Sequence, residues 1–144
     1  MLFDVVHVDY CDANRYDLEK ELEYFQLSYF GIDNFHTFER TVPYIDGRVY
    51  VINSNLSPIP GESLAYMLSK TMAVIRKKDP RSNIIIFSSG PEQFNMSDDE
   101  LTMVRGRGID IERIVPDICA LIKTGKLHTL SPMRVLIDGV RVPI

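Results

Sequence analysis

A buried strand followed by a loop and a helix constrains this chain more than any other stretch of its sequence. Residues 49–52 (Val-Tyr-Val-Ile) are all apolar, three of the four are β-branched, and the run ends at the polar Asn53. Such a run predicts a strand buried on both faces. Two prolines and Gly61 then interrupt the chain, and apolar residues recur at helical spacing to about Lys77. Ligands of open α/β sheets bind beyond the carboxyl ends of the strands, which makes Asn53 a candidate site residue.

The same alternation of strands and helices continues through most of the chain. It predicts an α/β fold with a doubly wound, mostly parallel five-stranded sheet. The few residues between Gly31 and Asn53 predict a shortened second helix. The expected strands cover residues 3–8, 34–40, 49–52, 83–87 and 109–115. The expected helices cover residues 12–31, 62–77, 98–105 and 116–125.

Two turn signals predict antiparallel pairing. Asp138-Gly139 lies between β-rich arms and predicts a C-terminal hairpin over residues 133–142. Asp46-Gly47 allows a second hairpin over residues 38–52, which would make that edge of the sheet antiparallel. The first is the stronger signal, and an isolated hairpin has to pack against the domain or against a partner.

Length and composition predict one globular domain. The 144 residues are 45% hydrophobic and 25% charged, which suffices for a real core. Residues 1–126 are expected to form the α/β domain, and residues 127–144 its hairpin extension. A net charge of −4 argues against nucleic-acid binding, and no apolar run approaches the roughly 18 residues of a membrane span, so we expect a cytoplasmic protein. Cys11 and Cys119 have neither disulfide nor metal spacing and read as small buried apolar residues.

The ends of the predicted strands define a candidate pocket. Parallel strands bring their carboxyl ends to one sheet edge, which would gather Asp9, Asn53, Ser88 and Val115. Ser89 and Gly90, which follow the fourth strand, could offer backbone amides to an anion or a small ligand. His7, inside the first strand, is interpreted as a core or sheet-face histidine, because no second ligand residue stands at supporting spacing.

These strand ends resemble the receiver domains of two-component response regulators. Residues 8–15 are similar to the acidic first loop and the start of the first helix, and residues 53–61 have the spacing of the phosphoacceptor loop up to its terminal glycine. Residues 85–88 resemble the fourth strand with its switch Ser/Thr, and residues 108–116 resemble the fifth strand leading to a Lys-Pro pair. The resemblance covers roughly residues 3–125, and it implies that the doubly wound sheet is of the flavodoxin-like or CheY-like type.

The chain departs from the family at most positions that carry its chemistry. The resemblance implies two acids that bind a divalent cation, an aspartate that accepts phosphate and a lysine that contacts the phosphoryl group. Asp9 matches the first acid, but Tyr10 replaces the second, Asn53 replaces the phosphoacceptor and Val115 replaces the lysine, while Ser88 matches the switch position. An amide is a poor nucleophile, and one carboxylate is a poor Mg²⁺ site. We therefore expect a vestigial phosphorylation pocket that binds no metal.

Three alternatives remain open from the sequence. Residues 53–57 are in register with the Asp-x-Asp-x-Thr motif of the haloacid dehalogenases, but both carboxylates are absent. His36-Thr37 and His128-Thr129 resemble the paired histidines of a phosphoesterase only by coincidence, because Thr follows His directly. A Rossmann-like protein that binds a small molecule or nucleotide is also possible, although no Gly-x-Gly-x-x-Gly or P-loop spacing occurs.

The expected function is that of a non-catalytic pseudo-receiver without a cofactor. In receivers the partner surface is formed by the fourth helix, the fifth strand and the fifth helix, which the resemblance places at about residues 97–123 of this chain. The hairpin over residues 133–142 adds an edge for strand pairing. We expect the protein to bind a protein partner, or a second copy of itself, through these surfaces, and not to be an enzyme.

Overall fold

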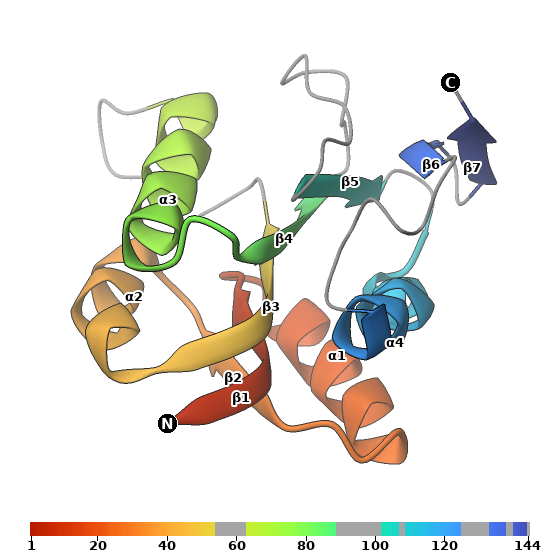
Figure 1. The fold of residues 1–144 in the computed structure, drawn as a ribbon, viewed down its shortest axis with the longest axis horizontal. Helices are drawn as coiled ribbons and strands as arrows, with labels where there is room; N and C mark the ends of the chain where they lie inside the picture. Colours follow the sequence, from red (N-terminus) through yellow and green to blue (C-terminus); the bar gives the residue numbers. More distant parts are fainter. Residues whose placement is uncertain (54–62, 89–101, 107–108, 125–132, 138–139, 144) are drawn as a thin grey trace.

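The computed structural model describes residues 1–53, 63–88, 102–106, 109–124, 133–137 and 140–143 (Figure 1). Its strands form one seven-stranded sheet in the order β2-β1-β3-β4-β5-β6-β7. The strands are β1 Leu2–Val8, β2 Tyr29–Ile32, β3 Asp46–Asn53, β4 Asn83–Ser88, β5 Thr102–Gly106, β6 Met133–Ile137 and β7 Val140–Pro143. The helices are α1 Asp12–Tyr24, α2 Phe35–Thr41, α3 Leu64–Lys78 and α4 Val115–Thr124, with 3₁₀ turns η1 Val42–Tyr44 and η3 Ile111–Ile114.

The sheet is mostly parallel. Neighbouring strands from β2 to β6 all pair in parallel, and only β6 and β7 pair antiparallel. The expected five-stranded sheet is therefore too small, because β6 pairs with β5 and β7 extends the sheet further. The arms β6 and β7 match the predicted hairpin, whose Asp138-Gly139 turn lies outside the described residues. The alternative hairpin over residues 38–52 is wrong, because β3 is parallel to both of its neighbours.

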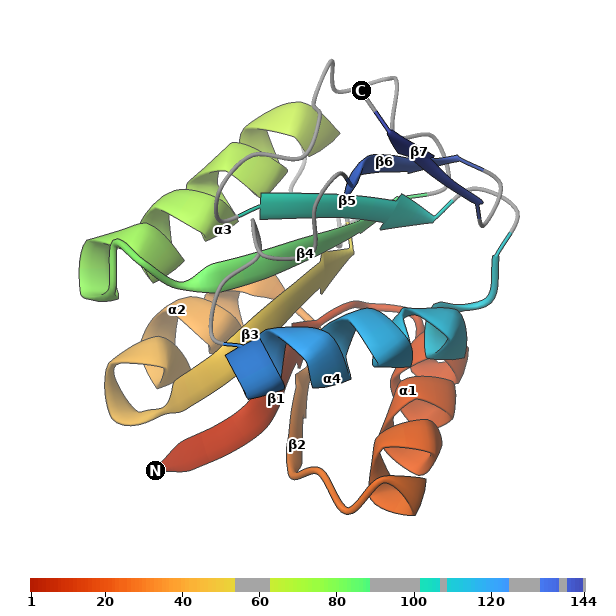
Figure 2. The same cartoon turned by 45° about the vertical axis from the view of Figure 1, so that its right-hand side comes forward.

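Two layers of helices cover the two faces of the sheet (Figures 1 and 2). Alternate residues of a strand point to opposite faces, so each central strand contributes to two separate cores. The helices α2 and α3 cover one face, and α1 with η3 and α4 covers the other. The first core contains Val6, Val8, Phe38, Tyr50, Ile52, Leu68, Ile75, Ile84 and Ile86, and the second contains Val5, Leu18, Leu22, Val49, Val51, Ile85, Ile114 and Ile118.

Helix α1 ends at Tyr24, seven residues before the expected end at Gly31. Gln26 has a positive φ of 60°. Its N–H donates to the Glu23 carbonyl at 2.9 Å, and the next N–H, of Leu27, donates to the Leu22 carbonyl at 2.9 Å. These two bonds form a Schellman motif, in which glycine is the usual left-handed residue. Gln26 therefore ends the helix without the glycine signal that the sequence pattern would need.

The second strand lies earlier in the chain than expected. β2 spans Tyr29–Ile32, whereas the residues expected as a strand, 34–40, mostly form helix α2. Asn34 begins this helix, because its side chain accepts a hydrogen bond from the Thr37 N–H at 2.8 Å. Phe35 and Phe38 are three residues apart, so both side chains can face the core from one side of a helix. The short second helix is therefore present, but at residues that were expected to be a strand.

The fifth strand is also displaced. β5 is Thr102–Gly106, within the expected helix, while the expected strand over residues 109–115 contains η3 and the first residue of α4. Val115 thus begins α4 and is buried in the second core. It therefore does not lie at the end of a strand, where the sequence analysis expects it.

The last turn of α3 carries the expected basic residues Arg76, Lys77 and Lys78. Cations at this end of a helix complement the helix dipole. The Lys78 ammonium also donates to the Val42 carbonyl at 2.6 Å and lies 3.1 Å from an Asp46 carboxylate oxygen. Lys78 therefore ties α3 to the start of β3. Within the described ranges, no helix is long and apolar enough to span a membrane.

Candidate functional site

The candidate site lies at the carboxyl ends of β1, β3 and β4. Val8 is beside Ile52 in the sheet register, and Asn53 is beside Phe87, one residue before Ser88. Asp9, Asn53 and Ser88 are therefore close to one sheet edge, as predicted. All three are buried, with 0%, 7% and 1% of their surface exposed. Since β1 lies between β2 and β3, this edge includes the point where the strand order reverses.

The carboxylate of Asp9 is the centre of a hydrogen-bond network. One oxygen, Oδ1, accepts from the Cys11 N–H at 2.9 Å. The other, Oδ2, lies 3.1 Å from His7 Nε2 and accepts from Asn14 Nδ2 at 3.1 Å. The side-chain amide of Asn53 donates a further hydrogen bond to this carboxylate. Four donors from β1, α1 and β3 thus surround one buried acid.

His7 extends this network to the edge strand β2. Its Nδ1 lies 2.8 Å from the hydroxyl of Tyr29. Burial raises the pKa of Tyr29 above its ordinary value, so the hydroxyl keeps its proton and donates to Nδ1. A neutral His7 must then carry its own proton on Nε2 and donate it to Asp9. Gly31 leaves room for this arrangement, because a Cβ atom there would lie only 2.7 Å from the Tyr29 hydroxyl oxygen.

The network sets the charge states of both titratable groups. Burial lowers the pKa of His7 below its ordinary value, although the hydrogen bond to Asp9 acts in the opposite direction. Burial raises the pKa of Asp9, but the hydrogen bonds from His7, Asn53 and Cys11 outweigh it, and the net direction is downward. At neutral pH the site therefore holds a neutral imidazole and an ionised carboxylate.

Stability is expected to fall as the pH drops below about 6.5. The pKa of His7 is lower in the folded protein than in the unfolded chain. Between these two pKa values the unfolded chain therefore binds a proton at His7 that the native protein does not bind. This contribution to stability is complete above the unfolded pKa and is lost at up to about 1.4 kcal/mol per pH unit as the pH falls toward the folded pKa. Urea unfolding at pH 7.5, 6.5 and 5.5 measures the slope.

The exposed His36 on α2 supplies the control for this pH dependence. The His36→Gln variant should keep the slope of the unmodified protein. Equal stability at all three pH values would contradict the prediction. So would a protonated His7 imidazole in NMR spectra recorded at pH 6.5.

The residues at this edge do not fit a magnesium site. Mg²⁺ in proteins is usually held by one or two carboxylates that keep free oxygen lone pairs. Here Asp9 is the acid at the end of β1, and its oxygens already accept from His7, Cys11, Asn14 and Asn53. Across the described ranges, no three His, Cys, Asp or Glu side chains are grouped to hold a metal ion.

The other predicted site residues lie apart from Asp9 or outside the described residues. Tyr10 follows Asp9 but is 49% exposed. Val115 lies in α4, as described above, and Ser89 and Gly90 fall outside the described residues. Cys11 and Cys119 are free thiols of intermediate exposure, so neither is as buried as expected.

A buried charged residue near the end of β5 was missed by the sequence reasoning. Arg105 pairs in register with Phe87 and is fully buried. Its Nε donates to Asp117 Oδ2 on α4 at 3.0 Å. A basic residue is therefore present close to the end of the fifth strand, but its guanidinium is held by α4. Arg105 is the one charged residue in residues 102–106, and a charge inside an otherwise apolar run does not indicate a buried strand. The sequence therefore predicted that these residues belong to a helix.

The sequence matches no protein-family model, and it matches no curated protein at a significant level. Solved structures are nevertheless similar in fold. The receiver domain of a Francisella response regulator is 15% identical with a TM-score of 0.62, over 85% of this chain and 98% of that chain. A CheY-like receiver domain protein from Methanospirillum hungatei is 11% identical with a TM-score of 0.61, over 86% of this chain and 96% of that chain.

A third structure is described as a transiently phosphorylated switch in bacterial signal transduction. It is 16% identical with a TM-score of 0.65, and the match covers 86% of this chain and 98% of that chain. At these identities the likeness concerns the fold, and it agrees with the strand order β2-β1-β3-β4-β5 described above. The chain therefore has the α/β fold of the response-regulator receiver domains.

Proposed function

We propose that this protein is a non-catalytic pseudo-receiver, a signalling module that works through protein contacts without aspartyl phosphorylation. The observation that supports it best is the hydrogen bond from the Asn53 amide to the buried Asp9 carboxylate at the end of β3. An amide occupies the position at which the resemblance to receivers implies a phosphoacceptor aspartate. The similar structure described as a phosphorylated switch supports the signalling role.

Neither Asn53 nor Asp9 is suited to accept a phosphoryl group in this arrangement. A carboxamide is neutral and a poor nucleophile, so Asn53 cannot form an acyl phosphate as aspartate does. Asp9 is ionised, but it is fully buried, and its oxygens accept several hydrogen bonds. Attack by Asp9 would break these bonds and leave buried donors unsatisfied, which costs about 1–3 kcal/mol for each donor.

Two regions are proposed as the interaction surface. The first is the part of residues 97–123 that includes β5, η3 and α4, and the second is the hairpin formed by β6 and β7. Because β6 pairs with β5, β7 is the outermost strand on this side of the sheet. An outermost strand has backbone groups that a partner strand can pair with.

Intact-mass spectrometry with acetyl phosphate and Mg²⁺ tests the absence of phosphotransfer. The unmodified protein should show no covalent mass increase of one phosphoryl group under conditions that label a phosphorylatable receiver domain. The Asn53→Asp variant is the matched control, because it restores the missing carboxylate at the end of β3. An adduct in the unmodified protein, mapped to Asp9 or Asp12, would overturn the proposal.

A further inference from the structure

The carboxylate of Asp9 would have to give up a hydrogen bond to hold a cation. A carboxylate has about four lone-pair sites, and Mg²⁺ binds such oxygens directly. Asp9 already accepts from four donors, which are His7 Nε2 and Asn14 Nδ2 at 3.1 Å, the Cys11 N–H at 2.9 Å, and the Asn53 amide. A divalent cation at this carboxylate would therefore compete with a donor that is already bound.

The next acid in the sequence is also engaged. Asp12 begins α1, and its carboxylate pairs with the guanidinium of Arg15. The same guanidinium donates to the backbone carbonyl of Asp9, so it joins the start of α1 to the end of β1. A second carboxylate for a cation would have to come from the end of β3, where this chain has Asn53.

Of the four donors to Asp9, His7 is the hardest to displace. Its side chain is 0% exposed, whereas Cys11 and Asn14 are half-buried, so water can take the place of those two donors. Its Nδ1 accepts from the Tyr29 hydroxyl at 2.8 Å, so both ring nitrogens have partners. If the imidazole turned away from Asp9, its Nε2–H would become a buried donor without an acceptor, which is unfavourable.

The edge strand β2 fixes the orientation of the imidazole. His7 lies beside Gly31 in the sheet register, two residues after Tyr29. The Tyr29 ring crosses Gly31 to reach His7, because a Cβ atom at residue 31 would lie 2.7 Å from the hydroxyl oxygen and 2.8 Å from Cε1. A glycine in β2 therefore allows the contact that holds His7 against Asp9.

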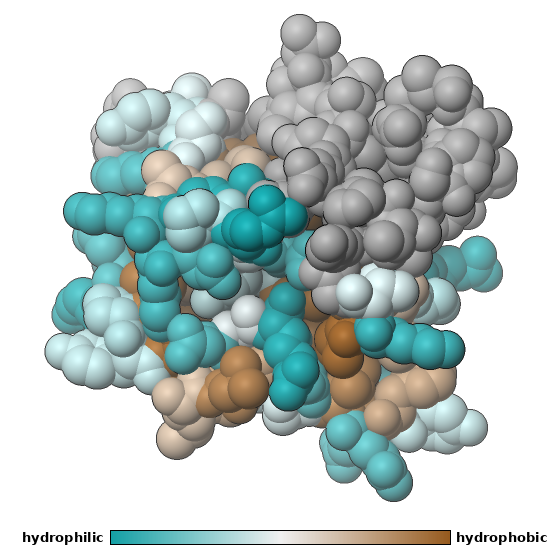
Figure 3. Space-filling view, viewed as in Figure 1, coloured by the Kyte–Doolittle hydropathy of each residue, from teal (hydrophilic) through white to brown (hydrophobic). Residues whose placement is uncertain are grey.

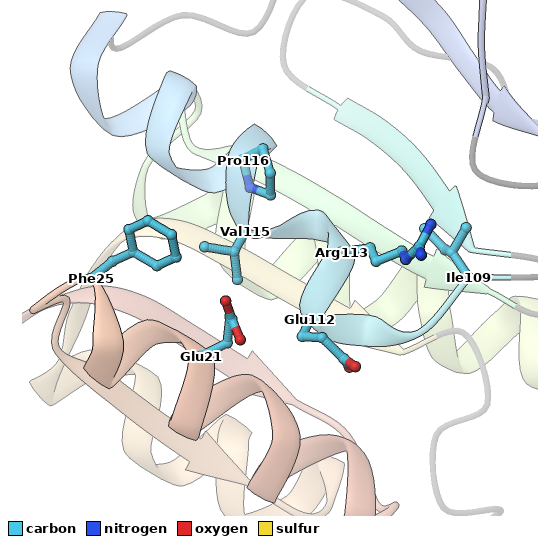
Figure 4. A pocket seen from close by; sticks show the side chains of 7 residues that line it. All are labelled: Glu21, Phe25, Ile109, Glu112, Arg113, Val115 and Pro116. Atoms are coloured by element: carbon cyan, nitrogen blue, oxygen red, sulfur yellow. The ribbon is translucent and has the colours of Figure 1, made fainter.

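Helices close this face of the sheet over the imidazole. His7 is on the same face of β1 as Val5, which α1, η3 and α4 cover. In Figure 3, apolar side chains gather where α1 meets α4. The cleft between α1 and η3 is lined by residues such as Glu21 and Val115, and neither His7 nor Asp9 lines it (Figure 4). This cleft therefore does not open onto the network around Asp9.

We infer that the His7 imidazole, held by Tyr29, closes this edge of the sheet to divalent cations and keeps Asp9 in place without one. The inference rests on the proposed function, and it names the residue that makes the site independent of Mg²⁺. His7 is a positioning residue, since its N–H occupies the lone pair that a cation would need. Restoring the missing carboxylate by Asn53→Asp therefore does not by itself restore a tight Mg²⁺ site.

Magnesium titrations of the full chain, followed by amide chemical shifts, test the inference. The unmodified protein should show no change at the ends of β1 and β3 at millimolar Mg²⁺. A double variant, His7→Leu with Asn53→Asp, should bind Mg²⁺ at least about tenfold more tightly than Asn53→Asp alone. Leucine fills a similar volume but has no donor for Asp9. Mg²⁺ should also raise the melting temperature of the double variant, because the cation binds only its folded state.

Two further variants separate this role from a general effect on the fold. His36→Leu, combined with Asn53→Asp, replaces an exposed histidine on α2 and should leave the Mg²⁺ affinity of Asn53→Asp unchanged. Tyr29→Phe, combined with Asn53→Asp, keeps the imidazole but removes its partner at Nδ1, and should raise the affinity severalfold. Thermal melting checks that each variant folds, and the Tyr29→Phe pair carries the test if His7→Leu does not. A merely structural role of His7 predicts a loss of binding and no gain.

Three results would overturn the inference. They are Mg²⁺-dependent shifts at Asp9 in the unmodified protein, equal Mg²⁺ affinity of Asn53→Asp with histidine or leucine at residue 7, and an equal gain from His36→Leu. Any of these in a protein that takes no phosphoryl group rejects the role of His7 and leaves the proposed function intact. A phosphoryl adduct on the unmodified protein rejects the proposed function whatever the Mg²⁺ affinity.

Discussion

Replacing Asp117 by alanine is expected to lower the free energy of unfolding by about 3–5 kcal/mol. Its carboxylate lies 3.0 Å from Arg105 Nε, and the two side chains are 6% and 0% exposed. Removal of one partner from a buried ion pair leaves the other charge in a medium that solvates it poorly. The bond also joins β5 to α4, so its loss should loosen the contact between that strand and the helix layer below it.

Urea unfolding of the variant and of Asp110→Ala measures this effect. Asp110 is exposed just before η3, and its replacement should change stability by about 0.5 kcal/mol or less. A double variant, Arg105→Met with Asp117→Leu, removes both charges and should lose less than Asp117→Ala alone. A loss below about 1 kcal/mol in Asp117→Ala would show that this carboxylate is not what compensates the buried guanidinium.

Replacing Asp9 by alanine is expected to cost about 3 kcal/mol. The carboxylate accepts hydrogen bonds from His7, Cys11, Asn14 and Asn53, and hydrogen bonds to charged groups are the stronger kind. The loss should be smaller than the sum over four donors, because Asn14 and Cys11 are half-buried and water can reach them. Chemical denaturation at pH 7 measures the change.

The exposed Asp17 on α1 provides the control for Asp9. Asp17→Ala should leave stability within about 0.5 kcal/mol of the unmodified protein. A double-mutant cycle between Asp9→Ala and Asn53→Ala should give a coupling energy of about 1 kcal/mol, since the two side chains share a hydrogen bond. A gain of stability in Asp9→Ala would be the opposite result. Carboxylates kept for binding or catalysis commonly destabilise the fold, so a gain would count against a non-catalytic site.

The central strands could be predicted because their side chains follow simple physical rules. The runs at residues 49–52 and 84–86 are apolar on both sides, as buried parallel strands require, and β3 and β4 contain them. Their polar ends, Asn53 and Ser88, are where the pattern placed them. The contact between Asn53 and Asp9 follows from the parallel pairing of β1 with β3.

The edges of the sheet could not be predicted in the same way. Gln26 adopts a left-handed conformation that favours glycine, so no glycine marks the end of α1 and the apolar spacing typical of a helix continues through Tyr29. β5 contains the fully buried Arg105, whose charge is compatible with a strand only because Asp117 on a distant helix pairs with it. A tertiary ion pair of this kind leaves no periodic signal in the strand itself.

Of the two contacts that His7 makes in the site, only one could be predicted from the sequence. His7 and Asp9 are two residues apart, so in a strand they share a face, and their contact could have been inferred from that spacing. The contact between His7 and Tyr29 could not, because Tyr29 was assigned to the first helix instead of β2. The role of His7 as the link between two strands therefore appears only in the folded chain.

The order of strands has a consequence for how the chain folds. The most apolar strands, β3 and β4, are interior, while the short strand β2 and the hairpin strand β7 are outermost. An intermediate in which only β1, β3 and β4 had paired would have open hydrogen-bonding edges at β1 and β4, which β2 and β5 cover in the native sheet. An intermediate arrested at that stage would present apolar strands to other chains, and unpaired apolar strands are the common origin of aggregation. In the native sheet, the short strand β2 and the hairpin of β6 and β7 therefore shield the apolar central strands from pairing with other chains.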